Sequence, residues 1–185
     1  MNRTGRLAVA RQPRRLAASG RRHVDPAAIA RRLGMAVHWP GAAGVRERSW
    51  RLVAQARDFD AWLIAWPSGS TADLHDHGRS RGALHVIRGS LVETIPWRDE
   101  EGRVTLARRE VHAGAALAFG AGHVHDVQNE AEVPALSLHV YSPPLESMNY
   151  YERFGDRLVA REKGWVAADD RTSSTDPSLL QLPAP

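Results

Sequence analysis

Short runs of β-forming residues, repeated about every ten residues, constrain the fold of this chain more than any other feature. From Trp50 onward the runs are WRLVAQ, FDAWLIAW, GALHVIRG, SLVETIPW, RVTLARREVH, ALAFG, HDVQN and ALSLHVYS. Gly, Pro, Asp and Asn separate these runs, and the polar segment RDEEG at 98–102 has the residues of a hairpin turn. This rhythm is typical of an all-β sandwich or barrel. We therefore predict an all-β fold.

The ends of this β-rich region carry different signals. Asp25 is a good helix N-cap and Pro26 suits the first helical position, so we expect AAIARRL to form a short helix that ends at Gly34. The Pro-Pro pair at 143–144 should end the strand ALSLHVYS. The segment YYERFGDRLVAREKGW at 150–165 fits either a strand pair or a short helix, and the sequence leaves both open.

The charge is unevenly distributed along the chain. Residues 1–32 contain nine Arg and one acidic residue, whereas the remainder contains 16 basic and 20 acidic residues. We predict a basic flexible leader at 1–23, one folded domain at 24–165 and a flexible tail at 166–185. A basic arm could bind nucleic acid or a membrane, but a solvated terminus is the favoured interpretation.

Composition excludes several classes of protein. The chain has no Cys, so it can form no disulfide, no thiolate zinc site and no cysteine nucleophile. It has no apolar run of about 20 residues, which a membrane-spanning helix needs, and its N-terminus lacks the apolar centre of a secretory signal. We expect a cytoplasmic protein, a monomer, without a membrane partner.

Histidines with metal-ligand spacing lie inside the β-rich region. His75 and His77 are separated by one residue, so on a strand both side chains point to the same face. Two imidazoles from one strand supply two-thirds of a facial metal site with open positions. The third ligand is expected from the stretch GHVHDVQN, where the spacing favours His125 over His123.

Two spaced patterns resemble the signature motifs of the cupin superfamily. They are Gly69-x5-His75-x-His77 followed by Gly89, and Gly114-x5-Gly120-x-Gly122-x2-His125-x3-Asn129. The resemblance implies a cupin jelly-roll barrel that brings the histidines together in its interior. The glutamate usual in the first motif is replaced by Arg81 or Gly82, which implies a three-histidine site.

The chain also resembles the cysteine dioxygenase family of thiol dioxygenases over about residues 51–144. The matching fragments are HDH at 75–77, GSLVET at 89–94 and SLHVYSPP at 137–144. Members bind Fe(II) through three histidines and insert both atoms of O2 into a substrate thiol, which gives a sulfinate. The resemblance implies that the Fe(II) ligands are His75, His77 and His125, and that the catalytic hydrogen-bonded triad is Ser137, His139 and Tyr141.

The residue types support this triad independently. Ser137, His139 and Tyr141 alternate along the sequence, so on a strand they share one face, and buried polar groups in such a row need one another as partners. Some family members cross-link a cysteine to the triad tyrosine. The corresponding residue here is Gly82, so the resemblance implies activity without a cross-link.

The resemblance implies that Arg51 is the arginine that binds the substrate carboxylate. A guanidinium can hold a carboxylate by two parallel hydrogen bonds. Tyr141 is expected to contact substrate as well. Trp62 and Trp66 share a strand face, and core packing is the favoured interpretation of both. Arg51 favours L-cysteine as substrate, with cysteine sulfinate as product.

Three alternatives stay open. One is a dioxygenase for 3-mercaptopropionate or another mercapto acid. Another is a non-enzymatic, ligand-binding cupin. The third is a three-histidine hydrolase or isomerase using Zn(II) or Mn(II), because imidazole ligands suit Fe, Zn, Ni and Cu alike. The partners expected on the main interpretation are a small thiol and O2, and nucleic acid is disfavoured.

Overall fold

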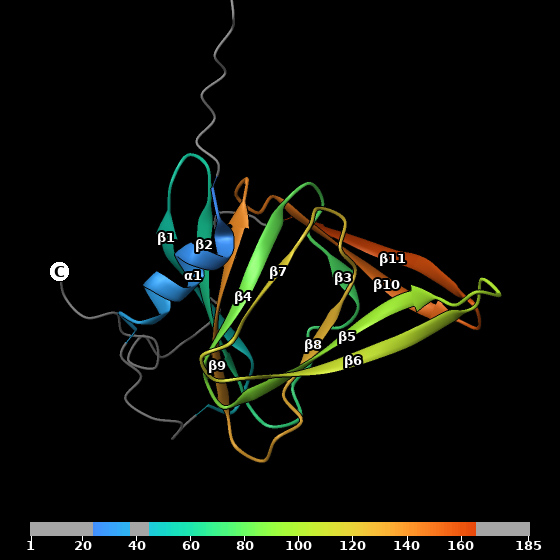
Figure 1. The fold of residues 1–185 in the computed structure, drawn as a ribbon, viewed down its shortest axis with the longest axis horizontal. Coiled ribbons are helices and arrows are strands. Elements are labelled where there is room, and N and C mark those ends of the chain that lie inside the picture. The colour runs from blue at the N-terminus through green and yellow to red at the C-terminus, as the bar shows by residue number, and fades with distance from the viewer. Residues whose placement is uncertain (1–23, 38–44, 166–185) are drawn as a thin grey trace, which may run out of the picture.

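The structure, a computed structural model, describes residues 24–37 and 45–165. The predicted leader at 1–23 and tail at 166–185 lie outside the described residues. The described part of the chain consists of one helix and eleven strands (Figure 1): α1 (Pro26–Gly34), β1 (Ser49–Gln55), β2 (Asp60–Trp66), β3 (His75–Asp76), β4 (Arg81–Arg88), β5 (Ser90–Arg98), β6 (Val104–His112), β7 (Ala116–Phe119), β8 (Asp126–Gln128), β9 (Ala135–Ser142), β10 (Ser147–Phe154) and β11 (Arg157–Trp165).

The strands form three sheets that enclose one interior. A five-stranded sheet has the order β1-β2-β9-β4-β7, and two three-stranded sheets have the orders β6-β5-β8 and β11-β10-β3. Side chains from several strands meet in one buried cluster between the sheets, among them Trp66, Leu84, Leu91, Phe119 and Val127. The expected all-β cupin barrel is confirmed, and Figure 1 shows β5, β6 and β8 facing the five-stranded sheet across the barrel.

Helix α1 begins and ends as the sequence predicts. The Asp25 carboxylate accepts hydrogen bonds from the backbone N–H groups of Ala27 and Ala28 at 3.0 and 3.2 Å, and Pro26 is the first helical residue. The helix packs on the outer face of the five-stranded sheet, over β4, β7 and β9, and Ala30 belongs to the same buried cluster as Leu138 and Val140. With nine residues, it is too short to cross a bilayer, and no other helix occurs in the described residues.

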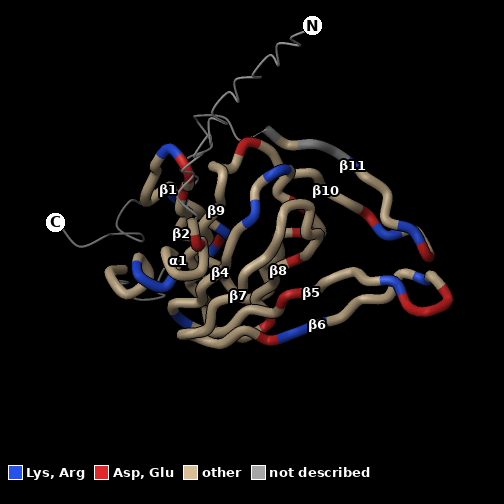
Figure 2. The backbone as a smooth tube through the Cα atoms, turned by 45° about the horizontal axis from the view of Figure 1, so that its top comes forward, with Lys and Arg blue, Asp and Glu red and all other residues tan. Residues whose placement is uncertain are grey.

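Two hairpins complete the barrel. The polar turn between β5 and β6 is confirmed: the Asp99 carboxylate pairs with Arg103 at 2.8 Å, and Gly102 adopts a φ of 79°. Figure 2 shows charged residues gathered at this tip. The segment 150–165, which the sequence left open between strands and a helix, forms a strand pair, because most of β10 lies antiparallel to β11 there.

Candidate active site

Three buried imidazoles converge at one end of the barrel interior. His75 lies on β3 and His77 follows it, while His125 immediately precedes β8 and exchanges two backbone hydrogen bonds of 2.9 Å with His75. The candidate ligand atoms of the three residues all lie within 4.8 Å of one another. The structure therefore brings together the three residues that the sequence predicts as metal ligands.

Hydrogen bonds orient two of these rings. The Nδ1 atom of His75 lies 2.7 Å from the carbonyl oxygen of Asp73, and Nδ1 of His125 lies 2.7 Å from a carboxylate oxygen of Glu93. Since both partners can only accept, each Nδ1 carries the hydrogen and each Nε2 keeps its lone pair. Nε2 of His125 is buried and has no hydrogen-bond partner in the described structure.

The donor set fits a divalent transition metal. A metal about 2.1 Å from two nitrogens at roughly a right angle holds them about 3 Å apart, and the Nε2 atoms of His75 and His77 are 3.1 Å apart. Burial, followed by the charge of His125, lowers the pKa of His75 to about 3, and burial lowers the pKa of His77 well below its usual value. Both imidazoles stay neutral at physiological pH, as metal ligands must be.

Glu93, whose role the sequence does not reveal, orients His125 at this site. It is 1% exposed and accepts hydrogen bonds from His125, from His123 at 3.2 Å and from Nε of Arg109 at 2.5 Å. Burial alone would raise the pKa of Glu93, but these hydrogen bonds lower it well below the usual range. His123 and His125 thus share one carboxylate oxygen of Glu93. A sequence signal existed, since Glu93 follows the buried Leu91 by two residues and shares its face.

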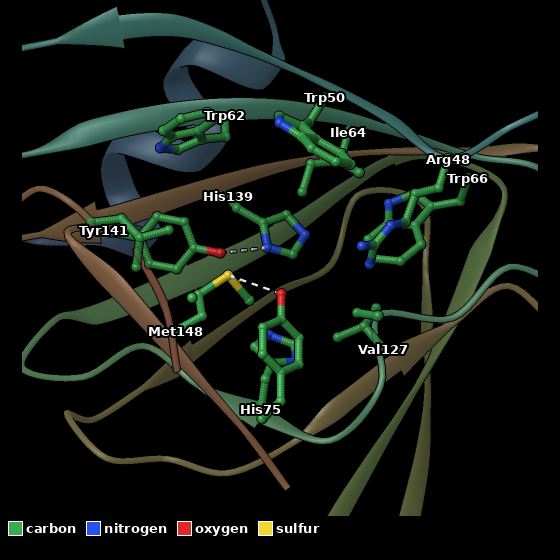
Figure 3. Close-up of a pocket in the computed structure, with 14 residues that line it drawn as sticks. Arg48, Trp50, Trp62, Ile64, Trp66, His75, Val127, His139, Tyr141 and Met148 are labelled. Atoms are coloured by element: carbon green, nitrogen blue, oxygen red, sulfur yellow. Dashed lines mark hydrogen bonds between the residues drawn. The ribbon is translucent and has the colours of Figure 1, made fainter. Parts of the chain in front are cut away.

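The predicted triad forms a buried row of hydrogen bonds on β9. The Ser137 hydroxyl lies 3.0 Å from Nε2 of His139, and Nδ1 of His139 lies 3.3 Å from the Tyr141 hydroxyl (Figure 3). Burial, with a smaller effect from the charge of His125, lowers the pKa of His139 to about 3. Burial and the Asp60 charge raise the pKa of Tyr141 above its usual value, so the phenol keeps its proton.

A cavity of about 290 Å³ adjoins His75 and two residues of the row. His75, His139 and Tyr141 form part of its wall, and the rest is mostly apolar: Trp50, Trp62, Ile64, Trp66, Ala72, Val127, Leu145, Met148, Tyr150 and Gly164. The favoured interpretation of Trp62 and Trp66 as core residues was incomplete, because both also line this cavity. Arg48 supplies the positive charge, and among the described residues no carboxylate lines the wall.

Arg51, which the sequence predicts to bind the substrate carboxylate, is not among the residues that line the cavity. Arg51 pairs with Leu63 across β1 and β2, and Leu63 packs toward α1 on the outer face of the sheet. Trp50 pairs with Ile64, and both face the cavity. Arg48 precedes Trp50 by two residues and lines the cavity, with its guanidinium carbon 5.6 Å from the Trp50 ring and 5.5 Å from the Trp66 ring.

Gly82 lies opposite the triad tyrosine, since it pairs with Tyr141 across β4 and β9. A Cβ atom at this glycine would lie 2.6 Å from the carbonyl oxygen of Val140 and 2.7 Å from the Phe119 ring. No larger residue fits there unless its neighbours move. The close packing accounts for glycine at the position that the resemblance assigns to the cross-linking cysteine.

Comparison with known proteins identifies relatives of this chain. The family model for cysteine dioxygenase type I matches residues 41–154, which is more than half of the chain. Cysteine dioxygenase type 1 of Danio rerio is 29% identical over 122 residues, covering 62% of this chain and 60% of that protein. The Rattus norvegicus protein of the same name is 29% identical over 101 residues, covering 51% of this chain and 50% of its own length. The chain thus spans about half to three-fifths of these relatives.

Solved structures with similar folds are more distant. A Klebsiella pneumoniae protein with a double-stranded β-helix domain is 16% identical, with a TM-score of 0.47 and coverage of 60% of this chain and 82% of that one. An oxalate oxidase in complex with glycolate is 22% identical with a TM-score of 0.44, covering 50% of this chain and 45% of that one. On the extent of the family match, this chain belongs to the cysteine dioxygenase type I family.

Proposed function

We propose that this protein is a non-haem Fe(II) thiol dioxygenase that converts L-cysteine and O2 into cysteine sulfinate. The reaction adds both oxygen atoms to the thiol sulfur, so R–SH and O2 give R–SO2H without a further reductant. The observation that carries the proposal is the juxtaposition of three buried imidazoles, the Ser137–His139–Tyr141 row and a cavity with one guanidinium at its wall. The match to the cysteine dioxygenase type I family supports the same chemistry.

His75, His77 and His125 would hold the metal. Three neutral imidazoles leave its full positive charge, and Fe(II) bound there would lower the pKa of a thiol and activate O2. Glu93 holds His125 in the tautomer that keeps Nε2 available. The family and the ligand set support iron, although the imidazoles alone would accept other divalent metals.

The remaining residues bind and orient the substrate. Arg48, rather than Arg51, binds the substrate carboxylate: its guanidinium pairs with the carboxylate while Trp50 and Trp66 hold the guanidinium in place. Tyr141 stays protonated and donates a hydrogen bond to the reacting oxygen or to the carboxylate. The tryptophan-rich wall excludes water, which strengthens each of these polar contacts.

A second candidate substrate class is supported by the lining of the cavity. Since none of the described cavity residues is a carboxylate, a substrate ammonium group would find no counter-charge among them. A mercapto acid such as 3-mercaptopropionate needs no such partner. The Arg48 pairing serves both classes equally, so the two are separated by assay.

The test is reconstitution of the full chain with Fe(II) without oxygen, followed by measurement of O2 uptake and of sulfinate by mass spectrometry. L-cysteine, 3-mercaptopropionate and cysteamine form the panel. We expect one sulfinate per O2 consumed, with a carboxylated thiol preferred. The Zn(II)-loaded protein is the control, because zinc occupies the ligands without redox chemistry. No sulfinate from any of the thiols would disprove the proposed function.

A further inference from the structure

Trp66 extends the hydrogen-bonded row at the Ser137 end, opposite the end formed by Tyr141. Its indole Nε1 donates to the Ser137 hydroxyl oxygen at 2.8 Å, and Trp66 and Ser137 are 1% and 0% exposed. Figure 3 shows Trp66 and Tyr141 on opposite sides of His139. An indole N–H can donate but never accept, so this contact fixes one end of the row.

The Ser137 hydroxyl has one hydrogen and two partners. The indole already donates to its oxygen, and the other side-chain partner in the described structure is Nε2 of His139 at 3.0 Å. If that Nε2 carried a hydrogen, two donors would point at one oxygen, and the serine hydrogen would be buried without an acceptor. Leaving a buried donor unpaired disfavours this arrangement by roughly tenfold or more. Ser137 therefore donates to His139.

The direction of hydrogen-bond donation along the row then continues through the imidazole of His139. A neutral imidazole carries one hydrogen, so a His139 ring that accepts at Nε2 carries its hydrogen on Nδ1. That Nδ1–H donates to the Tyr141 oxygen at 3.3 Å. The phenolic hydrogen is not used within the row and is available to the cavity that Tyr141 lines. If donation ran in the reverse direction, the Tyr141 hydroxyl would donate to His139 and present only a lone pair to the cavity.

We infer that Trp66 is a positioning residue: it sets the direction of the row, so that Tyr141 presents a hydrogen-bond donor to the cavity. The indole acts in two ways. It occupies acceptor capacity on the Ser137 oxygen, and by donating to that oxygen it polarises the hydroxyl and strengthens its donation to His139. The inference rests on the proposed function for its catalytic meaning, but the direction of the row can be measured without turnover.

The measurement is the tautomer of His139, read by ¹⁵N NMR of histidine-labelled, Zn(II)-loaded protein and assigned by the signal lost in His139→Gln. We expect the hydrogen on Nδ1 in the wild type. In Trp66→Phe, which keeps the ring bulk and removes the N–H, we expect the Nε2–H form to rise to at least about a tenth of the population. Ser137→Ala should produce the same mixing, because it removes the donor to Nε2.

Trp62→Phe is the matched control. Trp62 lies on the same strand and lines the same cavity, but its buried Nε1 has no hydrogen-bond partner in the described structure. This variant should leave the His139 tautomer unchanged. An Nε2–H ring in the wild type, or a Trp66→Phe spectrum like that of Trp62→Phe, would overturn the inference.

Activity separates this inference from the proposed function. With the Fe(II) protein, we expect Trp66→Phe to lower kcat for sulfinate formation about tenfold with a smaller change in KM, because the donor is needed by the reacting groups more than by the bound substrate. A wild type without any sulfinate formation would remove the proposed function and leave the tautomer result standing. An unchanged kcat in Trp66→Phe would remove the catalytic meaning of the row's direction.

Discussion

The two faces of the five-stranded sheet are built from the same strands but have different roles. On β2 and β9 the residues that face α1 are apolar, and Leu63, Leu138 and Val140 are all fully buried. The alternate residues of β9 face the barrel interior and form the row Ser137, His139 and Tyr141. One face therefore contributes stability and the other contributes chemistry, and substitutions on the two faces should have separable effects.

The largest effect should come from removing a ligand on the inner side. His125→Ala should lower metal affinity by three orders of magnitude or more, because two imidazoles and a vacancy replace a complete facial set. Metal content after dialysis and titration calorimetry measure this, with far-UV circular dichroism to verify the fold. His123→Ala is the control, since that ring contacts Glu93 rather than His75 or His77. Loss of metal from His123→Ala alone would show that the ligand was assigned to the wrong histidine.

A truncation on the outer face should do the opposite. Leu138→Ala should lower the free energy of unfolding by about 2–5 kcal/mol, because it leaves a cavity under α1 where the side chain is 0% exposed. Metal stoichiometry and KM should stay unchanged at temperatures where the variant is folded. Denaturant unfolding of the metal-free protein gives the first quantity. Coupled loss of metal by the folded variant would show that the two faces are not independent.

Substitution of Arg48 and of Arg51 compares the inner and outer sides of the sheet at two positions only three residues apart. Arg48→Ala should raise KM for carboxylated thiols about 10–100-fold by removing a charge-assisted pair, while cysteamine, which lacks a carboxylate, should be affected far less. Arg51→Ala is the matched control on the outer side of β1 and should leave all three KM values within about twofold. Steady-state O2 uptake measures both variants. A specific loss with Arg51→Ala would restore the interpretation made from sequence.

Arg48, and not the predicted Arg51, lines the cavity, and this difference shows which site residues can be identified from the sequence. Alternation along a strand predicts relative faces, so the pair His75 and His77 and the row on β9 were identified from spacing. The Arg51 assignment came instead from the family resemblance: in SWRLVAQ, Arg51 alternates with Trp50 and Leu52, and Arg48 lies before the strand begins. The all-β fold followed from the spacing of turns, which is local information.

Partners that are distant in sequence were beyond such reasoning. Glu93 lies 32 residues from His125, and Trp66 lies 71 residues from Ser137. Their roles depend on strand order and register: β5 pairs with β8, and β2 pairs with β9. The predicted metal ligands and the row can be identified from residue type and spacing. The residues that orient them can be identified only when the strand order and register are known.

The smallest expected effect is on the pH dependence of the free energy of unfolding, which should differ between substitutions on the two faces of the sheet. His75 and His139 have pKa values of about 3 in the folded protein, mainly through burial, against 6.5 for an unperturbed histidine. Below pH 6.5 the unfolded chain therefore binds protons that the native state does not, and stability falls as the pH falls. From pH 6 to pH 5 the two residues together should lower the free energy of unfolding of the metal-free protein by about 2 kcal/mol.

Variants from each face distinguish this origin from a general acid effect. His139→Gln should remove about a third of the loss, because His75 and His77 also have lowered pKa values and remain. Leu138→Ala should shift the whole stability curve down without changing its slope between pH 6 and pH 5. The window lies above the usual carboxylate pKa values, so acidic residues contribute little to it. Urea unfolding at a series of pH values provides the slopes, and equal slopes for wild type and His139→Gln would show that the inner-face histidines are not the groups that titrate.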